Sequence, residues 1–353
     1  MTVNTTQTKA RRHTRDDAGP TQRPRLEQHH PEQHHPEQGS ERDGQDRRNL
    51  PIAGTQPRRS ASAGVVVLAY LRLQAHALKS LEPMVRADEF DAVHQMRVAT
   101  RRLRATLRSF GQVIPRSDTE RLAGELKWLG GLLGAARDGE VLSAHLQASL
   151  RTVPVELLIG PVQARVQGHF APLRAAARTE LLEALDSPRY ARLMASLDHL
   201  TAGPLSGPRA GDLARDVLPT AVRKAYRQAD KRMRRARHTL PSPTGDVALH
   251  EARKSARRAR YAAEAAGPAI GPKARRFAKQ MKKVQSVLGD HQDTVLARHA
   301  ARDLGIGAHL AGENAFTYGL LYEREAHRAG RRQADARQVW KRASRSRYRK
   351  WMK

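Results

Sequence analysis

Apolar residues recur at intervals of three and four positions along the sequence from Ala61 onward, and this spacing constrains the fold more than any other feature. The spacing matches the turn of an α-helix, whereas a half-buried strand would need apolar and polar residues to alternate. No stretch of the sequence shows sustained alternation of that kind. The pattern therefore predicts an all-α fold.

The helical pattern is interrupted near the middle of the chain. Residues 203–211 contain two Gly-Pro dipeptides, which mark turns because neither residue type continues a helix well. We therefore predict two helical halves, residues 61–205 and residues 206–340. The stretch that follows, residues 341–353, is rich in Arg and Lys, and we expect it to be a solvated basic tail.

The two halves repeat each other. Residue types recur at a distance of 156 positions through the basic segment and at 155 positions after it. A long repeat of this kind indicates a duplicated bundle. The matched pairs are Tyr70 with Tyr226, His94 with His250, Arg97 with Arg253, Arg101 with Arg257, Arg102 with Arg258, Arg104 with Arg260, Lys127 with Lys282, and Asp138 with Asp293.

Residues 1–60 differ in composition from the rest of the chain. They are rich in Gln, Glu, His, Pro and Arg, and the pentapeptide Glu-Gln-His-His-Pro occurs at 27–31 and again at 32–36. Such a segment buries too little apolar surface to offset its loss of conformational entropy, so we predict a disordered tail. Its paired histidines lack further ligands at fixed spacing, and we predict no metal site there.

The charge balance predicts an anionic partner. The chain has 64 Lys and Arg against 35 Asp and Glu, a formal charge of +29. A field of this strength concentrates polyanions and speeds their association. Charge alone leaves nucleic acid, polyphosphate and anionic membrane open, but an aromatic content of 4% argues against proteins that stack successive bases.

The sequence also argues against a membrane protein and against several classes of enzyme. No apolar run approaches the roughly 20 residues that span a bilayer, and the N-terminus lacks a secretory pattern, so we predict a cytoplasmic protein. The absence of cysteine excludes disulfides, thiolate nucleophiles and Cys-based zinc sites. We predict no cofactor and no catalytic residue.

Two stretches of the sequence place basic residues on one face of a helix. The first stripe is about 80° wide and lies beside an apolar stripe that would pack the core. It contains His94, Arg97, Arg101, Arg104 and Arg108, with Arg102 beside it. The second copy contains His250, Arg253, Arg257 and Arg260, with Lys254 and Arg258 at its margin. Glu264 occupies the position of Arg108, and we expect it to pair with Arg260.

These stripes favour anion binding over a merely solvated face. Like charges at this spacing repel, and the pattern occurs in both halves. We expect each histidine to lie near the start of its helix, where unpaired backbone amides and the helix dipole attract anions. Contact with phosphate would raise the pKa of the histidine, so binding should strengthen as the pH falls through the histidine range.

Lysines and aspartates follow each basic stretch. We expect the lysines to face the same groove, and they are Lys127, Lys279, Lys282 and Lys283. A Leu-Gly pair comes next in each half and is followed by Asp138 or Asp293. We interpret the Leu-Gly pairs as helix ends and the two aspartates as caps of the next helices, rather than as metal ligands.

The paired motifs resemble those of the CHAD family, the conserved histidine α-helical domain. The resemblance extends across roughly residues 61–340 and is carried by the His-x-x-Arg and Arg-Arg-x-Arg elements of both stretches, each with Leu-Gly-x-x-x-Asp downstream. It implies two bundles related by pseudo-two-fold symmetry, with the basic helices lining a central groove that holds inorganic polyphosphate. Family members are often fused to a triphosphate-handling tunnel domain marked by Glu-x-Glu-x-Lys. This sequence shows no such element, so we expect a stand-alone binding domain.

We therefore predict non-catalytic binding of inorganic polyphosphate, with targeting to polyphosphate granules as a further expectation. The predicted site residues are His94, Arg97, Arg101, Arg102, Arg104, Arg108, Lys127, His250, Arg253, Lys254, Arg257, Arg258, Arg260, Lys279, Lys282 and Lys283. Two alternatives stay open. Charge supports weak nonspecific nucleic-acid binding, although no nucleic-acid motif is recognisable. A phosphohydrolase using the two histidines would need carboxylates or a metal, and the stripes supply almost only cations.

Overall fold

The described part of the chain is helical. A computed structural model describes residues 60–353, apart from the side chains of residues 116–118. These residues form α-helices and short 3₁₀ turns with no β-strand among them, so the all-α prediction is confirmed. None of the described helices carries an apolar stretch long enough to cross a bilayer. The predicted disordered tail, residues 1–60, lies outside the described residues except for Ser60.

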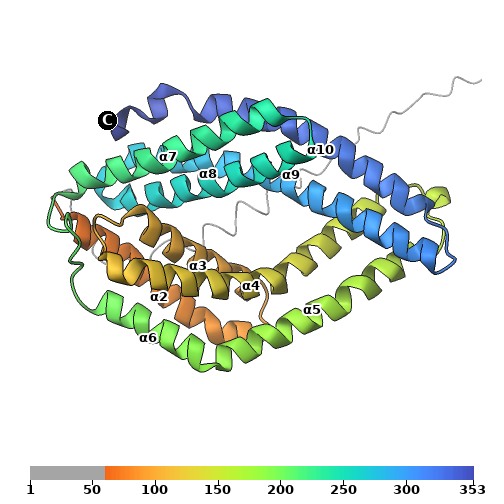
Figure 1. Cartoon of the computed structure of the whole chain (residues 1–353), viewed down its shortest axis with the longest axis horizontal. Coiled ribbons are helices and arrows are strands. Elements are labelled where there is room, and N and C mark those ends of the chain that lie inside the picture. The colour runs from red at the N-terminus through yellow and green to blue at the C-terminus, as the bar shows by residue number, and fades with distance from the viewer. Residues whose placement is uncertain (1–59) are drawn as a thin grey trace, which may run out of the picture. The chain divides into compact units, whose positions relative to one another are not determined.

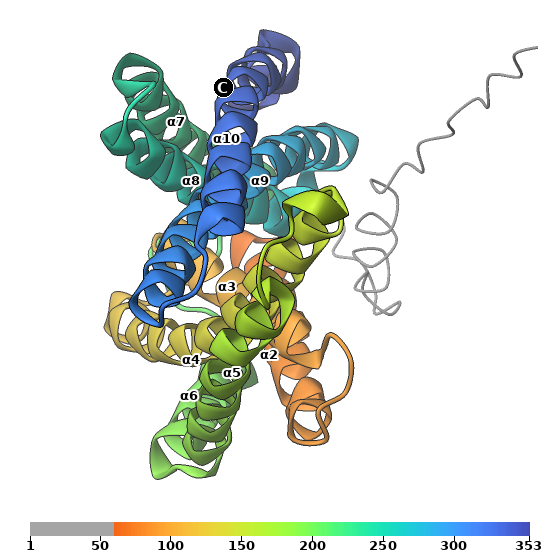
Figure 2. The ribbon, with the colours of Figure 1, turned by 90° about the vertical axis from the view of Figure 1, so that its right-hand side faces the viewer.

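The helices form two bundles (Figures 1 and 2). The first consists of α2 (Ala63–Arg86), α3 (Ala92–Ser109), α4 (Arg116–Leu150), α5 (Val162–Asp186) and α6 (Pro188–Ala202), with the turn η1 (Val155–Leu157). The second consists of α7 (Ala214–Thr239), α8 (Pro243–Ile270), α9 (Pro272–Leu310) and α10 (Phe316–Ala343), with η2 (Ser346–Tyr348) and η3 (Lys350–Met352). The break between α6 and α7 contains the Gly-Pro dipeptides that predicted it. The internal duplication stays a prediction.

One hydrophobic core joins the two bundles. Its buried side chains include Leu71 and Leu103 from the first bundle and Val222 and Phe277 from the second. α3 of the first bundle packs directly on α8 of the second. Each large apolar side chain contributes about 1.5–3 kcal/mol when it is removed from water. The two halves therefore share a core and depend on each other for stability.

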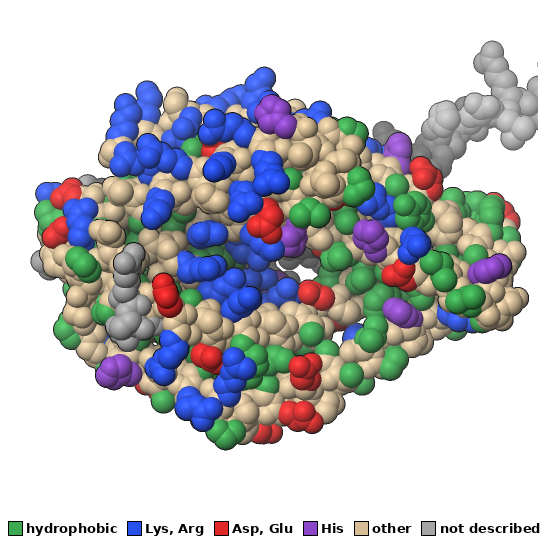
Figure 3. Space-filling view, viewed as in Figure 1, with side chains coloured by type: hydrophobic (Ala, Val, Ile, Leu, Met, Phe, Trp, Pro, Cys, Tyr) green, Lys and Arg blue, Asp and Glu red, His purple; other side chains and the backbone are tan. Residues whose placement is uncertain are grey.

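A second, smaller core joins the bundles at another place. The end of α4 and the start of α5 meet the end of α9 and the start of α10, on the right-hand side of Figure 1. Leu150, Phe170, Leu304 and Leu321 are buried there. Figure 3 shows a hollow between the bundles, and Lys and Arg side chains line it. The two junctions thus hold the bundles together while leaving an opening between them.

The Leu-Gly pairs lie inside long helices, so the prediction that they end helices is wrong. Gly134 is an interior residue of α4 and Gly289 an interior residue of α9. A methyl group added at Gly134 would lie 3.5 Å from a guanidinium nitrogen of Arg97, and one at Gly289 would lie 3.4 Å from that of Arg253. Each glycine thus lies beside an arginine of α3 or α8, at a distance where an added methyl group would be in ordinary contact.

Residues 341–353 pack against the second bundle, and the prediction of a solvated tail is wrong. The ring centroid of Trp351 lies 6.3 Å from that of Phe277. The guanidinium of Arg349 lies over the ring of Tyr226, 5.0 Å from its centroid. Aromatic residues placed between the basic ones provide the apolar contacts that hold this segment, and the charge count alone does not reveal them.

Candidate anion-binding groove

Four arginines from both bundles lie close together where α3 packs on α8. α3 supplies Arg97 and Arg101, and α8 supplies Arg253 and Arg257. The charges of Arg97 and Arg101 act on both arginines of the other helix. These four residues are the central arginine cluster. The sequence predicted all four as site residues, and the structure brings them together across the two bundles.

The central arginine cluster is electrostatically unfavourable in the free protein. Burial, and then repulsion by neighbouring arginines, lowers the pKa of Arg253 and lowers that of Arg257 to about 9, so both stay charged at neutral pH. Burial also lowers the pKa of Arg101. The Nε atoms of these three arginines are buried and have no hydrogen-bond partner among the described residues. Buried charges need partners, and a polyanion would supply them.

Two aspartates offset part of this charge. Arg97 Nη1 donates to Asp138 Oδ1 at 2.6 Å, and the charge of Asp293 favours the protonated form of Arg253. Both aspartates are interior residues of α4 and α9, so their interpretation as helix caps is wrong. The Asp138 side chain is 63% exposed, and an ion pair this exposed is worth at most about 1 kcal/mol. A multivalent anion can therefore replace it.

His94 and His250 occupy different positions in their helices. His94 lies in the first turn of α3, as expected. α8 begins at Pro243, two turns before His250, so the expectation that His250 lies near a helix start is wrong. Backbone amides are unpaired only in the first turn, and the dipole acts mainly there. The helix-terminus argument for anion binding therefore applies to His94 alone.

Burial lowers the pKa of both histidines. For His94 the charge of Asp91 opposes this shift and the nearby arginines add to it. For His250 the charge of Lys254 adds to it, while the hydrogen bond to Gln292 opposes it. His250 Nδ1 donates to Gln292 Oε1 at 2.6 Å. Both imidazoles are therefore mostly neutral at neutral pH and gain a proton when an anion binds beside them.

Three further basic residues form a second group, beside α7. Burial, and then repulsion by Arg108 and Arg258, lowers the pKa of Arg104. Burial, and then repulsion by Arg108 and by Arg232 of α7, lowers the pKa of Arg258. Arg104, Arg108 and Arg258 are the outer arginine group. All three were predicted site residues, and the structure places them together.

Arg102 and Arg260 lie in the contact between the bundles, and their role as ligand-binding residues stays a prediction. Arg260 Nε donates to Glu264 Oε1 at 2.6 Å, so the predicted pair is confirmed, and Arg102 Nε lies 3.4 Å from Glu264 Oε2. Both guanidinium groups also lie beside the ring of Tyr261, at 5.7 and 5.6 Å from its centroid. Their side chains are 12% and 9% exposed. Protein groups therefore neutralise part of their charge. Together with Glu264 and Tyr261 they are the closed end.

The predicted lysines differ in their placement. Lys127 and Lys282 lie on the faces of α4 and α9 that carry the two site glycines, seven residues before each glycine. Lys279 lies one turn before Lys282, whereas Lys283 lies about 100° around the helix from it. Lys254 is 52% exposed and pairs at 2.7 Å with a glutamate one turn away. Lys127 and Lys282 are thus the lysines best placed beside the central arginine cluster.

Three residues of the site were not among the predicted ones. Arg137 lies beside the histidine of α3, and Gln292 lies beside the histidine of α8. The repeat could have identified this pair, because the two positions match at the distance of 155 that relates Lys127 to Lys282. Tyr261 gave no signal, because alanine holds the matching position in the first half.

The sequence matches one protein-family model and two curated proteins. Residues 69–302 match the family model of the CHAD domain. Two uncharacterized proteins of Mycobacterium tuberculosis, MT2285 and Rv2226, are each 38% identical to this chain over 263 residues. The matches cover 73% of this chain and 49% of each relative. The chain therefore spans about half the length of these relatives.

Two solved structures share the fold. PptA from Streptomyces chartreusis matches with a TM-score of 0.67 and 22% identity, over 80% of this chain and 100% of that one. The CHAD domain from the plant Ricinus communis matches with a TM-score of 0.61 and 28% identity, over 82% of this chain and 96% of that one. The likeness to PptA concerns the fold alone. The paired bundles are thus common to proteins of distant sequence.

Proposed function

Since this chain belongs to the CHAD domain family, we propose that it binds inorganic polyphosphate, without cleaving it, in the groove between its two bundles. The observation that carries the proposal is the central arginine cluster. Its four guanidinium groups come from both bundles, and Asp138 and Asp293 offset part of their charge. A linear polyanion carries several negative charges in a row and relieves the repulsion at all four groups at once.

A bare phosphate chain fits this cluster better than a nucleic acid does. Bound bases would need exposed aromatic rings or hydrogen-bonding groups beside the phosphate contacts. The aromatic ring beside the arginines is that of Tyr261, which is only 2% exposed and already packed between Arg102 and Arg260. Most of the remaining groups are guanidinium groups, which suit phosphate oxygens, and no exposed aromatic ring is found beside them among the described residues on which bases could stack.

We propose binding rather than hydrolysis because the two neutral histidines of the groove have no cluster of metal-holding side chains beside them among the described residues. Cleavage of a phosphoanhydride needs a general base or metal-held water beside the bond. Asp138 and Asp293 face arginines, and within residues 60–353 no group of three or more His, Asp and Glu side chains is arranged to hold a metal. Incubation with long-chain polyphosphate and Mg²⁺ should release no inorganic phosphate. Turnover that the Arg101→Gln variant abolishes would contradict this part of the proposal.

The ligand is tested by parallel titrations in matched salt. The chain is titrated with long-chain polyphosphate and with duplex DNA, both expressed as phosphate concentration. We expect polyphosphate to bind at least about tenfold more tightly, a difference of about 1.4 kcal/mol. Equal affinity would mean that net charge rather than the groove determines binding, and it would contradict the proposal.

We further propose that polyphosphate binding brings the protein to polyphosphate granules in the cell. A fluorescent fusion should coincide with granules stained for polyphosphate. The same fusion carrying Arg101→Gln and Arg257→Gln should spread away from them, because it lacks one central arginine from each bundle. Granule localisation that persists in this variant would assign targeting to another part of the chain.

A further inference from the structure

The two helices that carry the central arginine cluster have opposite charges at one matching position. Arg108 of α3 corresponds to Glu264 of α8 in the sequence repeat. Beyond the cluster, Arg102 faces Glu264 on one side, and Arg258 faces Arg108 on the other. The groove therefore has an acidic residue, Glu264, on the side of Arg102 and a basic residue, Arg108, on the side of Arg258.

The arginines of the closed end already have a protein carboxylate beside them. Glu264 accepts a hydrogen bond from Arg260 at 2.6 Å and lies 3.4 Å from Arg102. The ring of Tyr261 covers both guanidinium groups. An anion entering here would compete with the partly buried carboxylate of Glu264, which is 22% exposed. This side of the groove therefore attracts polyphosphate less than the outer arginine group does.

The outer arginine group has the opposite character. Within the described part of the chain, no acidic side chain forms an ion pair with Arg104, Arg108 or Arg258. Arg108 is exposed and the other two are partly exposed. The three cations repel one another more strongly than Glu251 attracts Arg258, and a bound anion reduces that repulsion. This side of the groove attracts polyphosphate.

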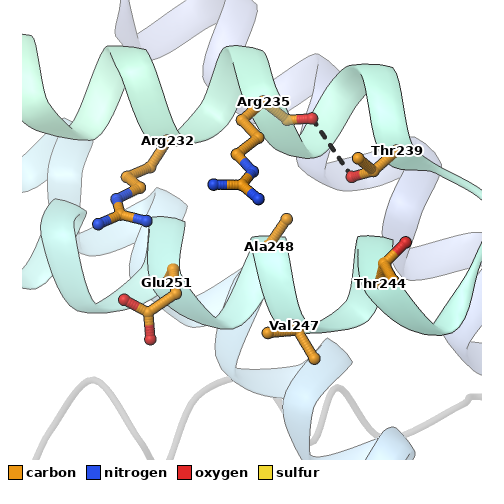
Figure 4. Close-up of a pocket in the computed structure, with 7 residues that line it drawn as sticks. All are labelled: Arg232, Arg235, Thr239, Thr244, Val247, Ala248 and Glu251. Atoms are coloured by element: carbon orange, nitrogen blue, oxygen red, sulfur yellow. Dashed lines mark hydrogen bonds between the residues drawn. The ribbon is translucent and has the colours of Figure 1, made fainter.

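The cations continue from the outer arginine group onto α7. Arg258 neighbours Arg232, and Arg232 and Arg235 line a cavity of about 280 Å³ between α7 and α8 (Figure 4). Both side chains extend from α7 toward α8. The carboxylate in this cavity, Glu251, is already bound by Lys254 at 2.7 Å. Figure 3 shows Lys and Arg side chains both in the hollow and over α7.

We infer that the outer arginine group and Arg232 form an exit track, along which a long polyphosphate chain leaves the groove over α7 rather than past the closed end. The inference rests on the proposed function. It adds the direction in which the bound polyphosphate leaves the groove and a dependence of affinity on polyphosphate length. Arg97 and Arg108 are separated by about 16 Å along α3, from the rise of 1.5 Å per residue. A short anion such as tripolyphosphate fills the central arginine cluster, whereas a long chain also occupies the track.

The test compares long-chain polyphosphate with tripolyphosphate on the same proteins. The track variant carries Arg108→Gln and Arg258→Gln, and the control carries Arg121→Gln and Arg192→Gln, two exposed arginines beside a cavity between α4 and α6. We expect the ratio of long-chain to tripolyphosphate affinity to fall about tenfold in the track variant. The slope of log affinity against log salt for the long chain should fall by about 0.7 for each arginine removed. The control should keep the wild-type ratio and slope.

A second variant extends the test beyond the contact between the bundles. Arg232→Gln lies on α7, away from α3, and should lower the same ratio about threefold by removing one phosphate contact. Thermal unfolding and circular dichroism establish that each variant is folded. If wild type binds both anions and neither variant changes the ratio, the track is wrong and the proposed function stands. If wild type binds neither anion, the proposed function itself fails.

Discussion

The closed end and the outer arginine group both contain arginines of the repeat, but the arginines have different roles. At the closed end, two arginines of the repeat surround Glu264 and stabilise the contact between the bundles. In the outer arginine group, Arg108 holds the position that matches Glu264. No acidic side chain within residues 60–353 forms an ion pair with these arginines, and only the more weakly acting charge of Glu251 favours the protonated form of Arg258. A basic residue of the repeat is therefore most available to a ligand where no acid faces it or where that acid, like Asp138, is largely exposed. The opposite charges at this matching position thus distinguish the two sides of the groove.

The largest contrast should appear in stability when the two matching positions are neutralised. Glu264→Gln leaves Arg260 and Arg102, 9% and 12% exposed, without their carboxylate, and we expect a loss of about 3 kcal/mol in the free energy of unfolding. Arg108→Gln removes an exposed and repelling charge and should change stability by no more than about 0.5 kcal/mol. Urea unfolding measures both. Equal losses of unfolding free energy in the two variants would show that Glu264 is no more important for stability than Arg108.

A smaller effect is expected from the hydroxyl of Tyr261. This side chain is 2% exposed and its hydroxyl hydrogen-bonds to Arg101. Burial alone would raise the pKa of Tyr261, but the surrounding guanidinium groups lower it. Tyr261→Phe should cost about 1 kcal/mol of stability, because a buried donor loses its partner. Tyr322→Phe, at a position 38% exposed, serves as the control and should be neutral within about 0.5 kcal/mol. A neutral Tyr261→Phe would remove this tyrosine from the closed end.

The histidines should couple binding to pH while stability changes in the opposite direction. The pKa values of His94 and His250 are lowered in the folded protein, so the unfolded chain binds more protons just below their ordinary pKa of 6.5. The free protein should therefore lose stability as the pH falls through this range. Bound polyphosphate raises both pKa values, so its affinity should increase over the same range.

Proton uptake on binding measures this coupling. Calorimetric titrations near the ordinary histidine pKa, in buffers with different ionisation enthalpies, should show protons taken up with polyphosphate. The variant with His94→Gln and His250→Gln should show almost none. Proton release by wild type would contradict the sign of the pKa shifts. Uptake that disappears when only His94 is replaced would assign the effect to the histidine in the first turn of its helix.

The smallest effects test whether the two basic helices are equivalent in packing. A methyl group at Gly134 or Gly289 would lie 3.5 or 3.4 Å from a guanidinium nitrogen, which is an ordinary contact. Alanine favours the helix by up to about 1 kcal/mol, so we expect a small gain in stability. We also expect an approximately twofold loss of polyphosphate affinity as the arginine shifts. Equal responses would support the predicted duplication, and a response in one helix alone would contradict it.

Local patterns of the sequence predicted the features that depend on local structure. The three- and four-residue spacing predicted the all-α fold, and the Gly-Pro dipeptides predicted the break between α6 and α7. The pair between Arg260 and Glu264 followed from their separation of one helical turn. Each of these features is set within a few residues of chain. The spacing of residues along one helix is sufficient to find them.

Features that depend on how helices cross could not be predicted in this way. The basic stripe of α8 is continuous in the sequence, yet its contact with α3 buries Arg260 and leaves Arg257 in the cluster. Gly134 suggested a helix end because glycine is common there, but it lies inside α4 beside Arg97. Trp351 lies in a charge run that suggested a solvated tail. In each case the position of the residue depends on a contact with a residue distant in sequence.

The most direct test of the central claim is polyphosphate titration of the variant with Arg101→Gln and Arg257→Gln. It removes one guanidinium of the central arginine cluster from each bundle. Two charged hydrogen bonds of about 1.5 kcal/mol each correspond to an affinity loss of at least about a hundredfold. The free variant should stay folded, because the reduced repulsion offsets the loss of the contact between Arg101 and the Tyr261 hydroxyl. A folded variant that binds long-chain polyphosphate as tightly as wild type, and as tightly as the Arg121→Gln and Arg192→Gln control, would contradict the account.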